Sequence, residues 1–301
     1  AQVVIGDVNG DGISDLATGW GLDQTPAIHF GPFDGPVAAA DIVLEGQRQV
    51  VGIGDPNDDG FDDVALVTEG FLEVLHGPDV QRVATLIGDE DTRATEVLRV
   101  GDVTGDGVPD LIVEWQGCSV VAGPFTGDTA LADVLIPLSD CPWAVGDLDG
   151  DGVNDLVVAN PNSFEERIVV WTYGPIGGDR LIDLDEGDAG VLRPDERTRY
   201  ASTLAAGDGN GDGITDLYVG DPEGGGASRR RVGLQPGTLS GMFGPFPTDR
   251  SPDSPDFSLV GPSEAALGSR AEFSPDLDED EVPELLIWHG DRALSVVTAQ
   301  P

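Results

Sequence analysis

Short apolar runs alternate with loops rich in Asp and Gly along the whole chain. Val, Ile and Leu gather before each loop and again directly after it, as at residues 3–7 and 15–20. Short runs of this kind, bounded by Gly, Asp and Pro, are typical of β-strands. No segment shows a convincing helical spacing of apolar residues over a dozen positions. We therefore expect each loop to join the two strands of a β-hairpin.

Two further apolar runs follow each hairpin. The third run often ends in Gly-Pro, as at 27–32 and 71–78, and a fourth follows it, as at 83–88. Four short strands in a unit of roughly 50 residues, repeated around a closed ring, describe the blades of a β-propeller. The pattern predicts an all-β fold of four-stranded antiparallel blades.

The first loop has a pattern of oxygen-bearing side chains that suits a metal ion. In a nine-residue frame, such side chains stand at positions 1, 3, 5 and 9, and Gly12 supplies a sharp turn at position 6. A calcium loop presents its ligands at odd positions in this way, with the backbone carbonyl of position 7, here Ile13, among them. One copy alone could equally be a solvated turn. The side chains of this first frame are Asp7, Asn9, Asp11 and Asp15.

The same frame recurs five more times, which makes coincidence a poor explanation. The sixth copy is degraded, because Glu281 replaces the turn glycine and Glu284 is longer than Asp. In the third copy, Thr104 offers a hydroxyl, a weaker ligand for a hard cation. We expect five metal sites and leave the sixth open. The further frames are Asp55, Asn57, Asp59 and Asp63; Asp102, Thr104, Asp106 and Asp110; Asp147, Asp149, Asp151 and Asp155; Asp208, Asn210, Asp212 and Asp216; and Asp276, Asp278, Asp280 and Glu284.

These motifs resemble a known repeat family. The GDxNGDGxxDLxVG core, upstream segments such as RYASTLAAGD and downstream FGP or YGP turns resemble the FG-GAP repeat of integrin α-subunit propellers and many secreted bacterial proteins. The resemblance covers essentially the whole chain and implies calcium at the frames above. The family fits six or seven blades, and six loops favour six. By this resemblance the backbone oxygens come from Ile13, Phe61, Val108, Val153 and Ile214.

We expect a single domain over residues 1–301, divided into six repeats. By the rhythm above, the last blade stops at its third strand, 293–298, and lacks an outer strand. An uncovered edge strand is a template for a protein partner or a second copy of the chain. A last blade shielded by a loop is the alternative. The repeats lie approximately at 1–47, 48–94, 95–139, 140–200, 201–268 and 269–301.

Charge narrows the class of partner. The net charge is -41, and all 15 basic residues are arginines. This balance argues against nucleic acid and anionic membranes, and favours cations or basic partners. We see no apolar run that could span a membrane. Segments 176–198 and 237–256 read as long surface loops, either tolerated insertions or binding loops.

The two cysteines bear on the compartment of the protein, and the scarcity of catalytic motifs bears on whether it is an enzyme. In a chain whose loops need extracellular calcium, Cys118 and Cys141 suggest a disulfide between neighbouring blades, with a buried thiol pair as the alternative. Histidines are few, His29, His76 and His289, and no hydrolase or phosphate-binding motif is present. We expect no enzyme.

The prediction is a secreted or cell-surface, calcium-stabilised module for protein interaction, adhesion or structural assembly. A carbohydrate-binding lectin is the first alternative, so a glycan ligand stays open, although the five tryptophans are scattered rather than repeated. An extracellular hydrolase or lyase domain is the second, because crowded carboxylates could imitate a glycosidase pair. Calcium is expected to be structural, linking metal affinity to folding.

Overall fold

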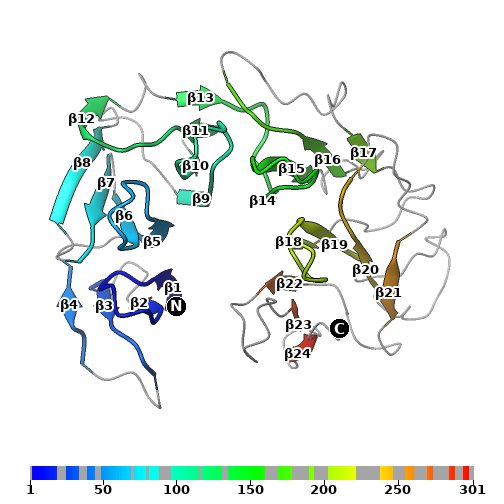
Figure 1. The fold of residues 1–301 in the computed structure, drawn as a ribbon, viewed down its shortest axis with the longest axis horizontal. Helices are drawn as coiled ribbons and strands as arrows, with labels where there is room; N and C mark the ends of the chain where they lie inside the picture. Colours follow the sequence, from blue (N-terminus) through cyan, green and yellow to red (C-terminus); the bar gives the residue numbers. More distant parts are fainter. Residues whose placement is uncertain are drawn as a thin grey trace. The chain divides into compact units, whose positions relative to one another are not determined.

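A computed structural model gives the fold (Figure 1). It divides the chain into two compact units, Ala1–Cys141 with Gly177–Leu181, and Pro142–Ile176 with Ile182–Pro301. The single domain of residues 1–301 stays a prediction. The structure describes residues 2–18, 25–33, 39–44, 49–68, 71–78, 81–87, 96–114, 117–130, 135–159, 169–177, 190–192, 203–221, 238–246, 255–260, 270–273, 285–288 and 294–297.

In the first unit, the described residues form three sheets, each beginning with the predicted hairpin. Neighbouring strands of one repeat are antiparallel, and the strand that enters each loop pairs with the strand that leaves it. The strands are β1 (Gln2–Gly6), β2 (Asp15–Thr18), β3 (Ala27–His29) and β4 (Ile42–Val43); β5 (Gln49–Gly54), β6 (Asp63–Thr68), β7 (Phe71–His76) and β8 (Gln81–Ile87); and β9 (Glu96–Gly101), β10 (Asp110–Glu114), β11 (Cys118–Val121) and β13 (Leu135–Pro137).

One strand of this unit was not predicted. β12 (Gly127–Ala130), from the third repeat, pairs in parallel with β8 of the second and makes that sheet five-stranded. Its sequence, GDTA, has no apolar run that would signal a strand. Arg82 of β8 and Asp128 of β12 form an ion pair at 3.2 Å. Both side chains are half exposed, so the pair contributes little stability.

The second unit contains two four-stranded sheets and one three-stranded sheet in its described part. No strand of the described residues pairs with the outer edge of β24, and the missing outer strand of the last blade stays a prediction. The strands are β14 (Ala144–Gly146), β15 (Asp155–Ala159), β16 (Val169–Thr172) and β17 (Gly190–Leu192); β18 (Thr203–Gly207), β19 (Asp216–Asp221), β20 (Thr238–Met242) and β21 (Phe257–Val260); and β22 (Arg270–Phe273), β23 (Leu285–Trp288) and β24 (Leu294–Val297).

Two sequence predictions in this unit were wrong. The expected loop 176–198 contains β17, the outer strand of the fourth sheet. The expected loop 237–256 contains β20. The β20 sequence, TLSGM, has only two large apolar residues, yet Leu239 and Met242 are both fully buried.

Within each unit, the core lies between successive sheets. Ile5 and Ile28 of the first sheet pack with Val64 and Leu66 of the second. A Cβ atom on Gly52 would lie 2.6 Å from the backbone oxygen of Ile5, so the first strands of these two sheets approach as closely as glycine permits. Sheets covered on both faces bury consecutive residues, which explains runs without polar alternation.

The second unit repeats this packing. Trp171 of β16 is fully buried and meets Phe246 edge to face, with ring centroids 5.7 Å apart. Leu217 of β19 joins the same cluster. These contacts give Trp171 a packing role. Trp20 and Trp115 lie outside the described residues.

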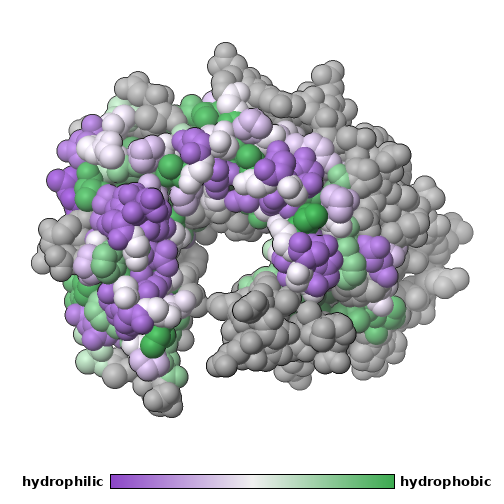
Figure 2. Space-filling model, in the orientation of Figure 1, coloured by the Kyte–Doolittle hydropathy of each residue, from purple (hydrophilic) through white to green (hydrophobic). Residues whose placement is uncertain are grey.

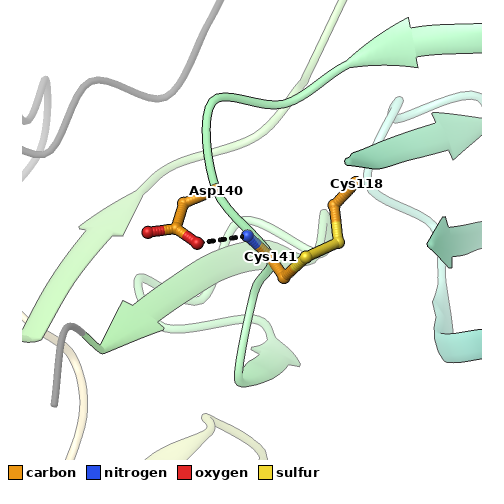
Figure 3. Close-up of a disulfide and its surroundings, with 3 residues drawn as sticks. All are labelled: Cys118, Asp140 and Cys141. Atoms are coloured by element: carbon orange, nitrogen blue, oxygen red, sulfur yellow. Dashed lines mark hydrogen bonds between the residues drawn. A yellow bond between two sulfur atoms is a disulfide. The ribbon is translucent and has the colours of Figure 1, made fainter. Parts of the chain in front are cut away.

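Cys118, the first residue of β11, forms a disulfide with Cys141, which follows β13 (Figure 3). Their Cα atoms are 5.0 Å apart. The Asp140 carboxylate accepts a hydrogen bond of 2.8 Å from the Cys141 amide. Both cysteines belong to the first unit, so a link between blades stays a prediction.

In the part of the chain described here, no helix is long and apolar enough to cross a bilayer.

Candidate metal centre

Five of the six predicted loops lie within the described residues, and each joins the first two strands of a sheet. The sixth, with Asp276, Asp278, Asp280 and Glu284, lies outside them. In each unit the loops turn hydrophilic side chains to the face shown in Figure 2. The frames predicted from sequence therefore correspond to equivalent places in the sheets.

Position 1 of each frame organises the loop backbone. Asp7 Oδ1 accepts hydrogen bonds from the amides of Gly10 (2.7 Å) and Asp11 (3.0 Å). Its Oδ2 accepts from the amide of Gly12 at 2.7 Å. Gly10 and Gly12 have φ angles of 76° and 84°, which glycine adopts without strain. The equivalent position-1 residues, Asp55, Asp102, Asp147 and Asp208, accept from their own loops in the same way.

In the fourth loop, the side chains at positions 1, 3 and 5 are all carboxylates and lie close together. One carboxylate oxygen from each of Asp147, Asp149 and Asp151 lies within 4.8 Å of the others. Burial raises the pKa of Asp149, and the negative charges of Asp151 and Asp147 raise it further. A cation among these oxygens would relieve both costs.

Position 9 is the first residue of the second strand and is fully buried in all five described loops. Asp15 Oδ1 accepts from the amide of Gly31 in the Gly-Pro turn, and Oδ2 from the amide of Val8, both at 3.0 Å. This carboxylate therefore fastens the loop to the turn that follows the third strand. The other position-9 residues, Asp63, Asp110, Asp155 and Asp216, accept from Gly77, Gly123, Gly174 and Gly244.

The Gly-Pro turn also receives the side chain at position 7. A Cβ atom on Gly31 would lie 2.5 Å from Ile13 Cγ2, so only glycine leaves room for it. From the sequence we expected position 7 to provide a backbone oxygen, and we did not predict its contact with the turn, although a Gly-Pro follows each of these five frames at a variable distance. The corresponding pairs are Phe61 with Gly77, Val108 with Gly123, Val153 with Gly174 and Ile214 with Gly244.

Burial makes the position-9 carboxylates reluctant to ionise. It raises the pKa of Asp15 and of Asp110 above the usual 3.8, while hydrogen bonds from Gly31 and Gly123 oppose the shift. It raises the pKa of Asp63 and Asp155 to about 7 and that of Asp216 to about 6, and nearby loop acids add to the effect. A bound cation favours the ionised form of such groups.

One repeat of the chain matches a known repeat family, and the whole chain resembles solved structures in fold. The model of the FG-GAP repeat matches residues 144–172, from β14 through the fourth loop to β16. The fold is similar to that of BBS1N crystallised in complex with ARL6DN and soaked with mercury, with a TM-score of 0.55, 11% identity, and coverage of 98% of this chain and 78% of that one. The chain has a β-propeller fold, and its fourth repeat is of the FG-GAP type. The lead-soaked crystal of the same complex gives a TM-score of 0.53 and 12% identity over the same shares. No curated protein matched this propeller by sequence.

The third loop of the propeller differs at position 3. The Thr104 hydroxyl donates to Asp110 Oδ1 at 3.4 Å, and the Thr104 amide donates to Asp110 Oδ2 at 2.9 Å. The hydroxyl is thus already engaged with the position-9 carboxylate. The expectation that Thr104 is a weaker ligand stays a prediction.

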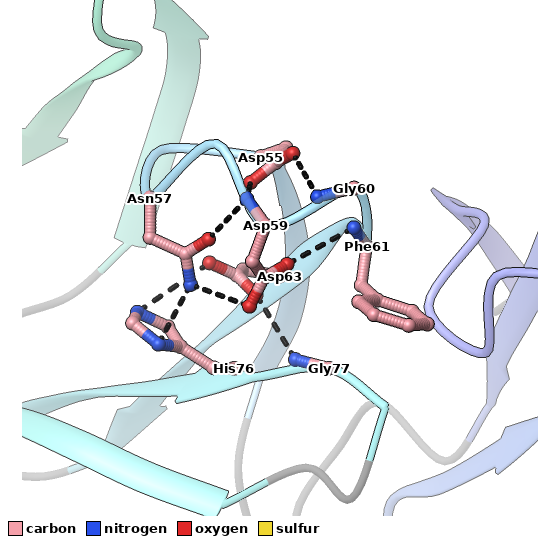
Figure 4. Close-up of polar contacts among 8 residues, drawn as sticks. All are labelled: Asp55, Asn57, Asp59, Gly60, Phe61, Asp63, His76 and Gly77. Carbon is pink, nitrogen blue, oxygen red and sulfur yellow. Dashed lines mark hydrogen bonds and ion pairs between the residues drawn. The ribbon is translucent and has the colours of Figure 1, made fainter.

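The second loop differs at position 2, which is Pro56, and in the turn, where Figure 4 shows His76. Pro56 has no amide hydrogen to donate, and buried Asp63 Oδ2 has no hydrogen-bond partner. His76 lies directly before Gly77, and its Nε2 is 3.5 Å from Asp63 Oδ2. Its Nδ1 is 2.8 Å from the side-chain nitrogen Nδ2 of Asn57. From the sequence, His76 counted only as one of a few histidines, so its place beside Asp63 was not predicted. Its occurrence together with Pro56 was the available signal.

Adjacent loops of the propeller are bonded to one another. The Asp62 amide donates to the backbone oxygen of Asp7 at 2.9 Å, and the Asp7 amide donates to Asp62 Oδ2 at 2.7 Å. In the second unit, the Thr215 amide donates to the backbone oxygen of Asp147 at 2.7 Å. The third loop has Pro109 at this position, which cannot donate.

The remaining histidines do not form a site in the described residues. His29 Nε2 lies 2.8 Å from the hydroxyl of Thr18. His289 lies outside the described residues, as does the arginine cluster 229–231.

Proposed function

We propose that this FG-GAP-type propeller is a non-catalytic extracellular module that binds calcium in its inter-strand loops and recognises a protein partner. The observation that carries the proposal is the repeated placement of a fully buried carboxylate beneath a loop of crowded acids. Calcium would neutralise these oxygens and hold the first two strands of each sheet together, so that ion binding adds to folding stability.

The donor set suits calcium. Every frame offers oxygen atoms, which hard cations prefer, and the second frame alone has an imidazole beside it among the described loops. In the first loop, backbone amides occupy both lone pairs of Asp7 Oδ1, whereas Oδ2 accepts from one amide and keeps a further lone pair for a cation. Of the described loops, the fourth has the largest number of carboxylates at positions 1, 3 and 5, so we expect it to bind most tightly.

Two observations support an extracellular setting. The Cys118–Cys141 disulfide is typical of oxidising compartments. The net charge of -41 would be partly offset by divalent ions, which are abundant outside cells.

A protein partner is supported by the fold. The BBS1N propeller was crystallised in complex with ARL6DN, so this fold can carry a protein-binding surface. Self-association through β24 is a second candidate, because no described strand covers its outer edge. Deleting residues 293–301 and measuring particle size by light scattering tests it, and unchanged assembly would exclude this route. A glycan array tests the lectin alternative, and turnover assays with polysaccharides test the hydrolase or lyase alternative.

Calorimetric titration of metal-stripped protein with calcium tests the metal proposal. We expect binding at several sites, with magnesium much weaker because it demands a stricter octahedral geometry. Replacing Asp147 and Asp151 with Asn should abolish one site. Asp128→Asn, an equal charge change per residue outside the loops, is the matched control. Absence of calcium binding by the unmodified protein would overturn the proposal.

A further inference from the structure

The second loop contains a buried oxygen that its own fold does not satisfy. In the first, third, fourth and fifth loops, position-9 Oδ2 accepts from the amide of position 2, at 3.0, 2.9, 2.7 and 3.0 Å. In the second loop Pro56 removes that donor, and Asp63 Oδ2 has no hydrogen-bond partner although Asp63 is 0% exposed. Such a group costs free energy unless something binds it.

His76 faces this oxygen at a separation that suits a shared metal ion. The distance from His76 Nε2 to Asp63 Oδ2 is 3.5 Å, longer than a good hydrogen bond. Two ligands bound tetrahedrally, at about 2.05 Å for nitrogen and about 2.1 Å for oxygen, lie about 3.4 Å apart. Figure 4 shows Asp63 between the loop and the imidazole. The other described turns have Phe30, Ala122, Tyr173 and Phe243 at the position of His76.

We propose that the second loop is a mixed nitrogen and oxygen site, in which His76 Nε2 and Asp63 Oδ2 bind a divalent transition ion of the zinc or cobalt type. Imidazole suits such ions better than it suits calcium. The inference rests on the proposed metal binding of the loops and gives this one a different selectivity.

Metal binding at Nε2 requires a rearrangement of Asn57. The metal-bound imidazole carries its proton on Nδ1, which then needs an acceptor. In this structure the side-chain nitrogen Nδ2 of Asn57 faces His76 Nδ1 and also donates to Asp59 Oδ2 at 3.0 Å. The side-chain oxygen Oδ1 of Asn57 accepts from the backbone amide of Asp59 at 2.9 Å. Turning the amide over presents its oxygen to Nδ1 and releases Asp59 as a third ligand. Among the described residues only Asp147, Asp149 and Asp151 already converge as a metal group, so Asp59 must move.

Cobalt titration of the full chain, followed by visible absorption in the presence of saturating calcium, tests the inference. We expect one tightly bound cobalt ion with the absorption of a nitrogen-containing low-coordinate site, and displacement of that ion by zinc. His76→Phe, which installs the residue of two other turns, should weaken cobalt binding about tenfold or more. Pro56→Val should weaken it by restoring the amide donor to Asp63. Asn57→Asp should strengthen it, because a carboxylate always accepts from Nδ1.

Controls separate this inference from the calcium proposal. Phe30→His in the first loop should create no cobalt site, because Asp15 Oδ2 already accepts from Val8. Calorimetric calcium titration of each variant reports the remaining loops. Equal cobalt affinity and spectra for the unmodified protein and His76→Phe would overturn the inference while leaving calcium binding intact. Cobalt binding that depends on His76, in a protein that ignores calcium, would overturn only the calcium proposal.

Discussion

The first and second loops share one unit and one frame, Asp-x-Asn-x-Asp followed by the position-9 Asp, yet their environments differ. In the first, Val8 and Gly31 satisfy both oxygens of Asp15. In the second, Asp63 accepts only from Gly77, and His76 faces its second oxygen. The frame thus decides where a loop forms, whereas residues outside its odd positions decide the chemistry of the site.

Position 4 makes the same point. Gly10 has φ of 76°, and a Cβ there would collide with the ring of Phe61 from the second loop. The second loop has Asp58 at this place, with φ of 57°, the one non-glycine with positive φ in the described residues. The first loop therefore needs glycine for packing and for conformation, whereas the second tolerates a strained residue.

The largest difference between the first and second loops is expected in the free energy of unfolding lost on substitution of position 9. Asp15→Ala leaves two backbone amides without their acceptor and should cost about 2–5 kcal/mol of unfolding free energy in chelator. Asp63→Ala leaves one and also removes an unsatisfied buried carboxylate, so its cost should be smaller by about 1–3 kcal/mol. Urea unfolding followed by tryptophan fluorescence measures both, and equal losses would contradict the assigned difference.

Substitutions at position 4 of the two loops should change the free energy of unfolding in opposite directions. Gly10→Ala should destabilise the protein by about 1–3 kcal/mol through strain and the collision with Phe61. Asp58→Gly should stabilise it by about 1 kcal/mol by relieving the positive φ. Urea midpoints report both changes. A stabilising Gly10→Ala would show that the packing of Phe61 on this loop is described incorrectly.

Acidity should stabilise the metal-free protein. The pKa of Asp63 is about 7 in the folded state against an ordinary 3.8, because burial disfavours its charge. This contribution is fully present below the unfolded pKa and is lost as the pH rises through about 7. We expect the Tm in chelator to rise as the pH falls from about 8 to about 5, and to rise less in Asp63→Asn. An identical pH profile for this variant would contradict the assignment.

The smallest effect is expected where the two loops meet. Asp62→Ala removes the acceptor of the Asp7 amide and should cost about 1 kcal/mol. It should also weaken calcium binding in the first loop, because Asp7 is a proposed ligand there. Asp128→Ala, on the exposed strand β12, is the control. Calcium titration distinguishes the two variants, and equal affinities would show that the loops are independent.

The frame and the hairpins could be predicted because the repeated Asp and Gly positions report a local backbone conformation. The contacts of Gly31, Asp62 and His76 could not, since they join residues from different strands or different repeats. The strands β12 and β20 were not predicted for another reason. Both contain few large apolar residues and are held in place by pairing with neighbouring strands. Tertiary pairing overrides weak local preference at such places.

Thermal unfolding of the full chain with calcium and then with excess chelator tests the central claim most directly. The account predicts a large rise in Tm with calcium, since an ion that binds only the folded state adds about 2.7 kcal/mol per site at a hundredfold excess over Kd. A variant in which Asn replaces all four of Asp7, Asp11, Asp147 and Asp151 should lose much of this rise in Tm. A Tm that is the same with calcium and with chelator would mean that the loops are acidic turns held by backbone hydrogen bonds alone.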